Sequence, residues 1–240
     1  MTEIHVGSLF SGIGGIDLGL ERVGMIVKWQ SEIEPYSCRV LKKHWPDVPN
    51  LGNIREVNWE EVERVDVIAG GYPCQPFSNA GKRGGSDDPR HLWPEMLRAI
   101  SVLRPRVAFL ENVRGHYSLG FDRVLGDLAD IGYDCEWEIV SAQSVGAPHR
   151  RERLICLAYP NGSRRQGSVR TQETCEAISR LDYSSKAEGS SDQWVVEPDV
   201  GRVAHGIPAR VDRLRGLGNA VVPQVAEVVG RVIMEMLAPL

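Results

Sequence analysis

The chain lacks the features of a membrane protein or of a secreted, disulfide-rich one. No apolar run approaches the roughly 20 residues that a membrane-spanning helix requires. The first residues, Met1 to Ile4, contain neither the basic nor the apolar segment of a signal peptide. The five cysteines are odd in number and irregularly spaced, which favours a reducing compartment over a disulfide framework. We therefore expect a cytoplasmic protein without a membrane partner.

Metal-binding patterns and internal repeats are also missing from the sequence. Neither the cysteines nor the six histidines stand at the spacing of metal ligands, so we expect no metal. The formal net charge of -4 argues against indiscriminate binding to polyanions, although arginines gather in the second half of the chain. With 240 residues, 42% hydrophobic and 25% charged, the composition is that of one globular α/β domain with a small appendage.

Strand-like and helix-like patterns alternate along most of the chain. The predicted strands cover residues 6–10, 26–31, 65–69, 106–110, 135–140 and 154–159, and the predicted helices cover 16–23, 35–44, 92–103, 121–131 and 223–237. This alternation predicts an α/β fold, in which the last two strands form a hairpin. Residues 161–200 are poor in apolar side chains, and we interpret them as a long irregular insertion.

The most informative stretch is the sequence GGYPCQPFS at residues 70–78. It follows a β-branched, apolar run that predicts a buried strand, so Cys74 stands where that strand gives way to a loop. In open α/β sheets this edge binds ligands. An isolated cysteine is more often an inert core residue, but the Pro-Cys-Gln-Pro frame favours a presented, reactive thiol.

Three features in the first quarter of the chain are compatible with a nucleotide-like ligand. Residues 11–15, SGIGG, form a glycine-rich turn between strand and helix, although a plain tight turn explains them equally well. Glu32 follows the second strand, where a carboxylate accepts ribose hydroxyls; a surface glutamate before a helix is an equal alternative. Asn53 with Ile54 suits an adenine ring, although a turn asparagine is the commoner use of this residue.

Charged side chains are predicted to meet Cys74 at the same sheet edge. Glu111 follows the fourth strand, and a carboxylate buried there needs a partner or a task. Arg151 and Arg153 would face the same side of a strand, a geometry suited to a phosphate or a base carbonyl, with surface arginines as the plainer alternative. Residues 79–89 are polar and glycine-rich, and we interpret them as a flap beside the thiol. A thiol, a carboxylate and arginines together suit covalent attack on an electron-poor ring.

With these residues laid out, the chain resembles the DNA (cytosine-5) methyltransferases, which use S-adenosyl-L-methionine. The resemblance runs in order over nearly the whole chain outside residues 161–211. It rests on Phe10 to Gly15, Gly71 to Ser78, Glu111-Asn112-Val113, Arg151-x-Arg153 and Gly218 to Pro223. Pro-Cys-Gln with Glu-Asn-Val at this separation is highly specific.

The resemblance implies a Rossmann-like methyltransferase fold, a mostly parallel sheet with helices on both faces and a small irregular target-recognition insertion. It divides the chain into a catalytic and cofactor-binding core at 1–160, the insertion at 161–212 and a C-terminal segment at 213–240 that returns to the core. Family members usually carry a much longer recognition region, so a short recognition sequence is expected.

The resemblance also implies a covalent mechanism on a cytosine flipped out of double-stranded DNA. The thiolate of Cys74 would add to carbon 6 of the ring and activate carbon 5 toward the methyl group. Glu111, with a pKa raised by burial, would donate to ring N3. Arg151 would hold the base carbonyl, and Arg153 would shape the site and favour the thiolate.

The family's pattern, carried onto this sequence, gives a set of cofactor residues. The residues implied to bind the cofactor are Phe10, Ser11, Gly12, Ile13, Gly14, Glu32, Ile33, Asn53, Ile54, Gly71, Pro73, Leu92, Asn219 and Ala220. Because the insertion would have to read the DNA by itself, its arginines are candidates for phosphate or guanine contacts, and with the flap residues the expected DNA-binding set is Ser78, Lys82, Arg83, Arg164, Arg165, Arg170, Arg202 and Arg210. Ile33 and Asn53 depart from the aromatic residue and the aspartate that are common in the family, and His149 replaces a frequent glutamine.

Two other functions stay open at the level of the sequence. One branch of the same family methylates transfer RNA, and a catalytically inactive, cofactor-binding regulator would fit the reduced recognition region. The latter leaves the intact set of Cys74, Glu111 and Arg151 unexplained. For the DNA enzyme we expect a monomer, prokaryotic or phage-encoded, with a cognate restriction endonuclease as a candidate partner.

Overall fold

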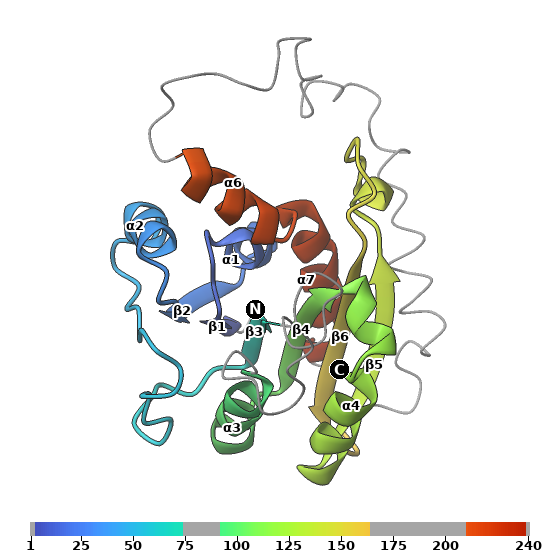
Figure 1. Cartoon of the computed structure of the whole chain (residues 1–240). Helices are drawn as coiled ribbons and strands as arrows, with labels where there is room; N and C mark the ends of the chain where they lie inside the picture. The colour runs from blue at the N-terminus through green and yellow to red at the C-terminus, as the bar shows by residue number, and fades with distance from the viewer. Residues whose placement is uncertain (1–2, 74–91, 164–209, 239–240) are drawn as a thin grey trace.

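The computed structural model describes residues 3–73, 92–163 and 210–238 (Figure 1). These residues form a six-stranded sheet in the order β2-β1-β3-β4-β6-β5. The strands are β1 (His5–Leu9), β2 (Ile26–Ser31), β3 (Val67–Gly71), β4 (Val107–Val113), β5 (Tyr133–Val140) and β6 (Arg153–Pro160). The first four strands run parallel, and β6 lies antiparallel between β4 and β5. The predicted mostly parallel sheet is thus confirmed, and so is the hairpin of the last two strands.

Helices cover both faces of the sheet (Figure 1). They are α1 (Gly15–Arg22), α2 (Pro35–His44), α3 (Trp93–Leu103), α4 (Phe121–Asp130), α6 (Arg210–Asn219) and α7 (Pro223–Leu237), with short 3-10 turns η2 (Arg114–Ser118) and η3 (Ala142–Val145). Side chains alternate along each strand, so Phe109 joins the apolar cluster under α1 and α7, and Leu110 joins the one under α3 and α4. No helix among the described residues is both long and apolar enough to cross a membrane.

Most elements lie within about two residues of their predicted positions, and α6 is the helix that the sequence patterns missed. Gly216 and Gly218 lower its helix propensity, since each costs about 1 kcal/mol relative to alanine. The packing at Gly216 is tight, because a Cβ atom there would lie 3.1 Å from Cγ2 of Ile13. The expected insertion falls largely on residues 164–209, outside the described residues, so the domain boundaries stay predictions.

The first and last helices of the described chain pack closely through a glycine. A Cβ atom added at Gly19 of α1 would lie 2.4 Å from the carbonyl oxygen of Pro223 and 2.5 Å from Cβ of Ala226, both on α7. The absence of a side chain at position 19 therefore sets the distance between these helices.

Replacing Gly19 by alanine is expected to destabilise the protein by about 2 kcal/mol, because backbone atoms of α7 would have to move. The matched control is Gly126→Ala in α4, where an added Cβ atom meets nothing within 4 Å. That change should stabilise the protein by about 0.5 to 1 kcal/mol through helix propensity. Urea unfolding of both variants measures the effects, and equal stability would show that α1 and α7 are not in close contact.

Candidate active site

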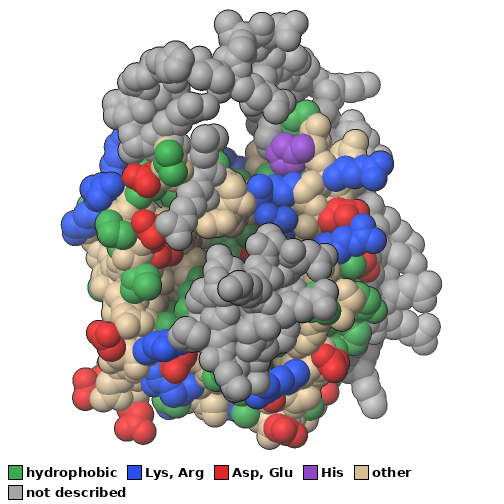
Figure 2. All heavy atoms as spheres, viewed as in Figure 1, with side chains coloured by type: hydrophobic (Ala, Val, Ile, Leu, Met, Phe, Trp, Pro, Cys, Tyr) green, Lys and Arg blue, Asp and Glu red, His purple; other side chains and the backbone are tan. Residues whose placement is uncertain are grey.

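A cavity of about 760 Å³ opens at the carboxyl ends of the parallel strands. Its wall includes Phe10 and Ser11 after β1, Glu32 after β2, Gly71 at the end of β3 and Glu111 near the end of β4. Ligands bind at this edge in open α/β sheets. Figure 2 shows the face of the molecule hollowed in this region, with Lys and Arg side chains at the border.

The cavity gathers most of the residues that the resemblance implied for the cofactor. Those lining it are Phe10, Ser11, Gly12, Glu32, Ile33, Asn53, Ile54, Gly71, Pro73, Leu92, Asn219 and Ala220. Ile13 and Gly14 are not among the lining residues, and their assignment to the cofactor stays a prediction. Ile13 packs toward Gly216, and Gly14 caps α1 in a left-handed conformation next to the ring of Trp45. Their contribution to the site is to shape the turn.

Glu32 is fixed in the cavity wall by three backbone N–H groups. Gly12 donates to its Oε2 atom at 2.7 Å, while Ile33 and Glu34 donate to Oε1 at 2.8 and 2.7 Å. Gly12 reaches this position with a positive φ of 55°. A carboxylate offers about four lone-pair directions, so one is left for a ligand hydroxyl. The second strand thus brings an oriented acceptor to the glycine turn.

The loop after α2 supplies an apolar part of the wall. Ile54 is buried and lines the cavity, while Asn53 donates to Oε1 of Glu56 at 2.7 Å and accepts from the Arg55 N–H at 3.2 Å. The side chain of Asn53 therefore has the turn-forming bonds of the alternative stated above, although the residue also lines the cavity. Arg98 of α3 holds the loop by donating to the carbonyl oxygen of Ile54 at 2.9 Å.

Glu111 is a buried carboxylate at the centre of the sheet edge. It is 7% exposed, and the guanidinium of Arg153, the first residue of β6, pairs with it at 2.8 Å (Nε to Oε1). Gly71 lies opposite Glu111 in the β3–β4 register, and a Cβ atom there would approach Oε2 to 2.4 Å. The glycine is needed to admit the carboxylate.

Burial raises the pKa of Glu111 to about 7, although the charges of Arg153 and Arg151 act in the opposite direction. The direction of this shift is the one that the implied role of Glu111 as a proton donor requires. Near neutral pH the side chain exchanges a proton readily and can act as a donor.

The backbone that follows β3 is tied to β4 by groups whose role the sequence did not reveal. The amide of Asn112 donates to the carbonyl oxygen of Tyr72 at 3.1 Å. The Tyr72 hydroxyl lies 2.9 Å from Nε2 of His116, and both rings are buried. Asn112 stands inside the Glu-Asn-Val motif, which was the available signal, whereas nothing in the sequence singled out His116. These contacts fix the chain up to Pro73, next to Cys74 in the sequence.

The prediction that Arg151 and Arg153 share one face of a strand is wrong. β6 begins only at Arg153, and Arg151 has a left-handed backbone with φ of 33°, so the two side chains do not follow strand alternation. Nη2 of Arg151 instead donates to the carbonyl oxygens of Leu217, Gly218 and Ala220, at 3.2, 2.6 and 2.6 Å. Arg151 does not line the cavity.

Several predicted residues lie outside the described part of the chain. They are Cys74, Ser78, Lys82, Arg83, Arg164, Arg165, Arg170 and Arg202. Arg210 is the first residue of α6, but its side chain is not among those described. Within the described ranges no group of three or more His, Cys, Asp or Glu side chains is arranged to hold a metal ion.

The sequence matches the family model described as C-5 cytosine-specific DNA methylase over residues 4–195. It is 37% identical over 156 residues to the Type II methyltransferase M.NgoMIV of Neisseria gonorrhoeae, covering 63% of this chain and 50% of that protein. It is 38% identical over 161 residues to the Type II methyltransferase M.Eco47II of Escherichia coli, covering 64% and 39%. The chain thus spans half or less of the length of these two relatives.

Solved structures share the fold. A putative DNA modification methyltransferase encoded within an E. coli prophage superposes with a TM-score of 0.56 at 28% identity, covering 66% of this chain and 47% of that one. A mutant of Spodoptera frugiperda DNMT2 gives a TM-score of 0.59 at 23% identity, covering 70% and 53%. The second likeness concerns the fold alone.

Proposed function

Because the chain belongs to the family of C-5 cytosine-specific DNA methylases, we propose that it methylates carbon 5 of cytosine in a short specific sequence of double-stranded DNA. The observation that carries the proposal is the buried Glu111–Arg153 pair, which lines one cavity together with the glycine turn and the end of β3. A proton donor beside a cofactor-sized cavity is what activation of a pyrimidine requires.

The cavity suits S-adenosyl-L-methionine, which supplies the methyl group when bound. Its volume of about 760 Å³ lies within the range of roughly 300 to 1,000 Å³ that is usual for such ligands. Glu32 offers an oriented acceptor for a ribose hydroxyl, and Ile54 an apolar surface for adenine. Asn219 and Ala220 line the cavity on the side of α6.

In the proposed mechanism Cys74, Glu111 and Arg153 each have one role. Cys74, as its thiolate, adds to carbon 6 of the flipped cytosine, which makes carbon 5 nucleophilic. Glu111 in its protonated form donates to N3 and so removes the charge that develops on the ring. Arg153 holds the Glu111 carboxyl group in place through the 2.8 Å contact. After carbon 5 has gained the methyl group, a base takes the proton from carbon 5, the bond between carbon 6 and sulfur breaks, and Cys74 leaves as its thiolate. The proton on N3 returns to Glu111, which regenerates the starting state of the enzyme.

Flipping the base is necessary because a stacked ring is inaccessible from both faces. In this proposal Ser78, Lys82 and Arg83 belong to the flap beside the base, while Arg164, Arg165, Arg170, Arg202 and Arg210 contact the DNA. A cognate restriction endonuclease is the partner suggested by the Type II names of the relatives.

The proposal is tested with duplex DNA carrying 5-fluorocytosine, which traps the adduct because its fluorine cannot leave as a proton would. We expect a denaturation-resistant complex that requires S-adenosyl-L-methionine, with Cys74→Ser as the blank. A transfer RNA substrate is the parallel assay. Capture on RNA alone would indicate the transfer RNA branch, and no capture on either would favour an inactive regulator. Bisulfite sequencing of DNA from expressing cells then gives the recognition sequence.

A further inference from the structure

The guanidinium of Arg151 contacts the backbone of another element of the fold. One nitrogen of its guanidinium, Nη2, lies within 3.2 Å of three backbone carbonyl oxygens, those of Leu217, Gly218 and Ala220. All three belong to the C-terminal end of α6 or to the residue that follows it. The side chain therefore joins the loop before β6 to a helix more than 60 residues away in sequence.

The end of α6 needs such a partner. The last carbonyl groups of a helix have no N–H donor within the helix, and they lie at the negative end of its dipole. α6 has no basic residue in its own last turn, so the positive charge comes from Arg151. Charge-assisted bonds of this kind are stronger than neutral ones.

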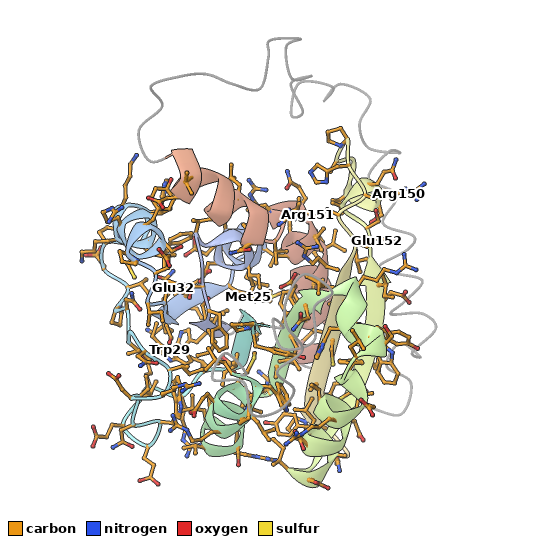
Figure 3. The ribbon with its side chains drawn as sticks, viewed as in Figure 1. Met25, Trp29, Glu32, Arg150, Arg151 and Glu152 are labelled. Carbon is orange, nitrogen blue, oxygen red and sulfur yellow. The ribbon has the colours of Figure 1, made fainter. Side chains whose placement is uncertain are left out.

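The loop that presents Arg151 is itself anchored. The carbonyl oxygen of Arg150 accepts from the backbone N–H of Ala142 at 2.7 Å and from the Ser141 hydroxyl at 2.8 Å. Figure 3 shows Arg151 on the side of the hairpin that faces α6, whereas Arg150 points to the opposite side. The left-handed φ of 33° at Arg151 is consistent with this sharp change of direction.

The clamped carbonyl groups border the proposed cofactor cavity. Gly218, Asn219, Ala220 and Val221 all line it, and the carbonyl oxygen of Val221 would lie 2.4 Å from a Cβ atom at Gly15. The segment that follows α6 thus rests on Gly15, the first residue of α1. A shift of this helix end changes the width of the cavity on that side.

We propose that Arg151 is a positioning residue for the cofactor: it holds residues 217–220, at the end of α6 and just after it, near the glycine turn, and so forms the cofactor side of the cavity before DNA binds. This inference rests on the proposed function. It differs from a contact with the base carbonyl in one measurable respect. A residue that touches only the flipped base leaves cofactor affinity in the absence of DNA unchanged, whereas a residue that holds the cavity wall alters it.

The experiment measures binding of S-adenosyl-L-methionine to the full chain by calorimetry without DNA. Arg151→Met should raise Kd about tenfold or more, because the methionine keeps the unbranched apolar stem of the side chain but donates no hydrogen bond. Arg151→Lys should recover part of the loss, since an ammonium group can also donate to several carbonyls. The control is Arg150→Met: Arg150 is exposed, and its side chain has no hydrogen bond or ion pair among the described residues.

Hydrogen exchange gives a second readout that does not use the cofactor. Amides near the end of α6 should exchange faster in Arg151→Met than in Arg150→Met. If Arg151→Met binds the cofactor as tightly as the wild type and protects α6 equally, the positioning role is wrong. If the wild type itself binds no S-adenosyl-L-methionine, the proposed function fails instead, and the exchange result still decides whether Arg151 holds α6.

Discussion

Replacing Glu111 by glutamine is expected to lower kcat for methyl transfer by about 100-fold to 10,000-fold. Glutamine has nearly the same shape, and its carbonyl oxygen can still accept from Arg153, which pairs with the carboxylate at 2.8 Å in the wild type. It cannot deliver a proton to N3 of the base. Affinity for S-adenosyl-L-methionine should change by less than about threefold, because in the proposed mechanism Glu111 contacts the base and not the cofactor.

The pH dependence identifies which form of Glu111 acts. Its pKa is raised to about 7 by burial, so the protonated fraction falls as the pH rises above that value. The alkaline limb of the kcat/KM profile should therefore fall in the wild type and be missing in Glu111→Gln. A wild-type profile that keeps rising to pH 9 would contradict the role of proton donor. Circular dichroism of the variant checks that the fold is retained.

The second large effect concerns stability. Replacing Asp17 by asparagine is expected to stabilise the protein at pH 8 by up to about 3 kcal/mol, the equivalent of its pKa shift. Asp17 is fully buried in α1, where its Oδ1 atom accepts from the Gln30 amide at 3.3 Å. Its Oδ2 atom has no hydrogen-bond partner among the described residues. Burial raises its pKa from 3.8 to about 6, which means that folding disfavours the charged form.

The sign follows from linkage. A pKa of Asp17 that is higher in the folded than in the unfolded protein means that the folded protein binds the proton more tightly. The contribution of protonated Asp17 to the free energy of unfolding is therefore complete below about pH 4 and is lost as the pH rises through 6. Asparagine does not titrate, so the stability gap between variant and wild type should widen with pH and level off above pH 7. Asp122→Asn, an exposed first-turn residue of α4, is the control. Urea unfolding at several pH values measures the gap; a gap independent of pH would be inconsistent with a buried, titrating Asp17.

The sequence predicted those parts of the fold that depend on local patterns. Periodic apolar residues placed α7 at Pro223–Leu237 and β2 at Ile26–Ser31, and the structure has the same bounds. It did not predict α6, because Gly216 and Gly218 oppose helix formation locally. Tertiary packing favours a glycine at position 216, where an added Cβ atom would lie 3.1 Å from Cγ2 of Ile13, whereas one at Gly218 would meet nothing within 4 Å. Nor did any local pattern specify that β6 inserts between β4 and β5, a pairing set by contacts distant in sequence.

In the candidate site, too, the sequence predicted what local patterns determine and missed what depends on tertiary contacts. The glycine turn, Glu32 and Glu111 each follow a strand predicted from the sequence, so the rule that strand ends share an edge brought them together. The two arginines were assigned from spacing alone, and spacing does not reveal where a strand begins. Because β6 starts at Arg153, only that residue pairs with Glu111, whereas Arg151 turns toward α6. A contact between residues so far apart leaves no trace in a single sequence.

The packing of α7 against α1 has a consequence for synthesis of the chain. Apolar residues on this face of the sheet, such as Val6 and Val67, share one cluster with Val225 and Val229 of α7. While the ribosome is still making α7, that face has no cover from it, and exposed apolar surface promotes aggregation. We therefore expect the native state to form after translation of α7, and yields in a host to improve with slower synthesis or with chaperones that bind apolar segments.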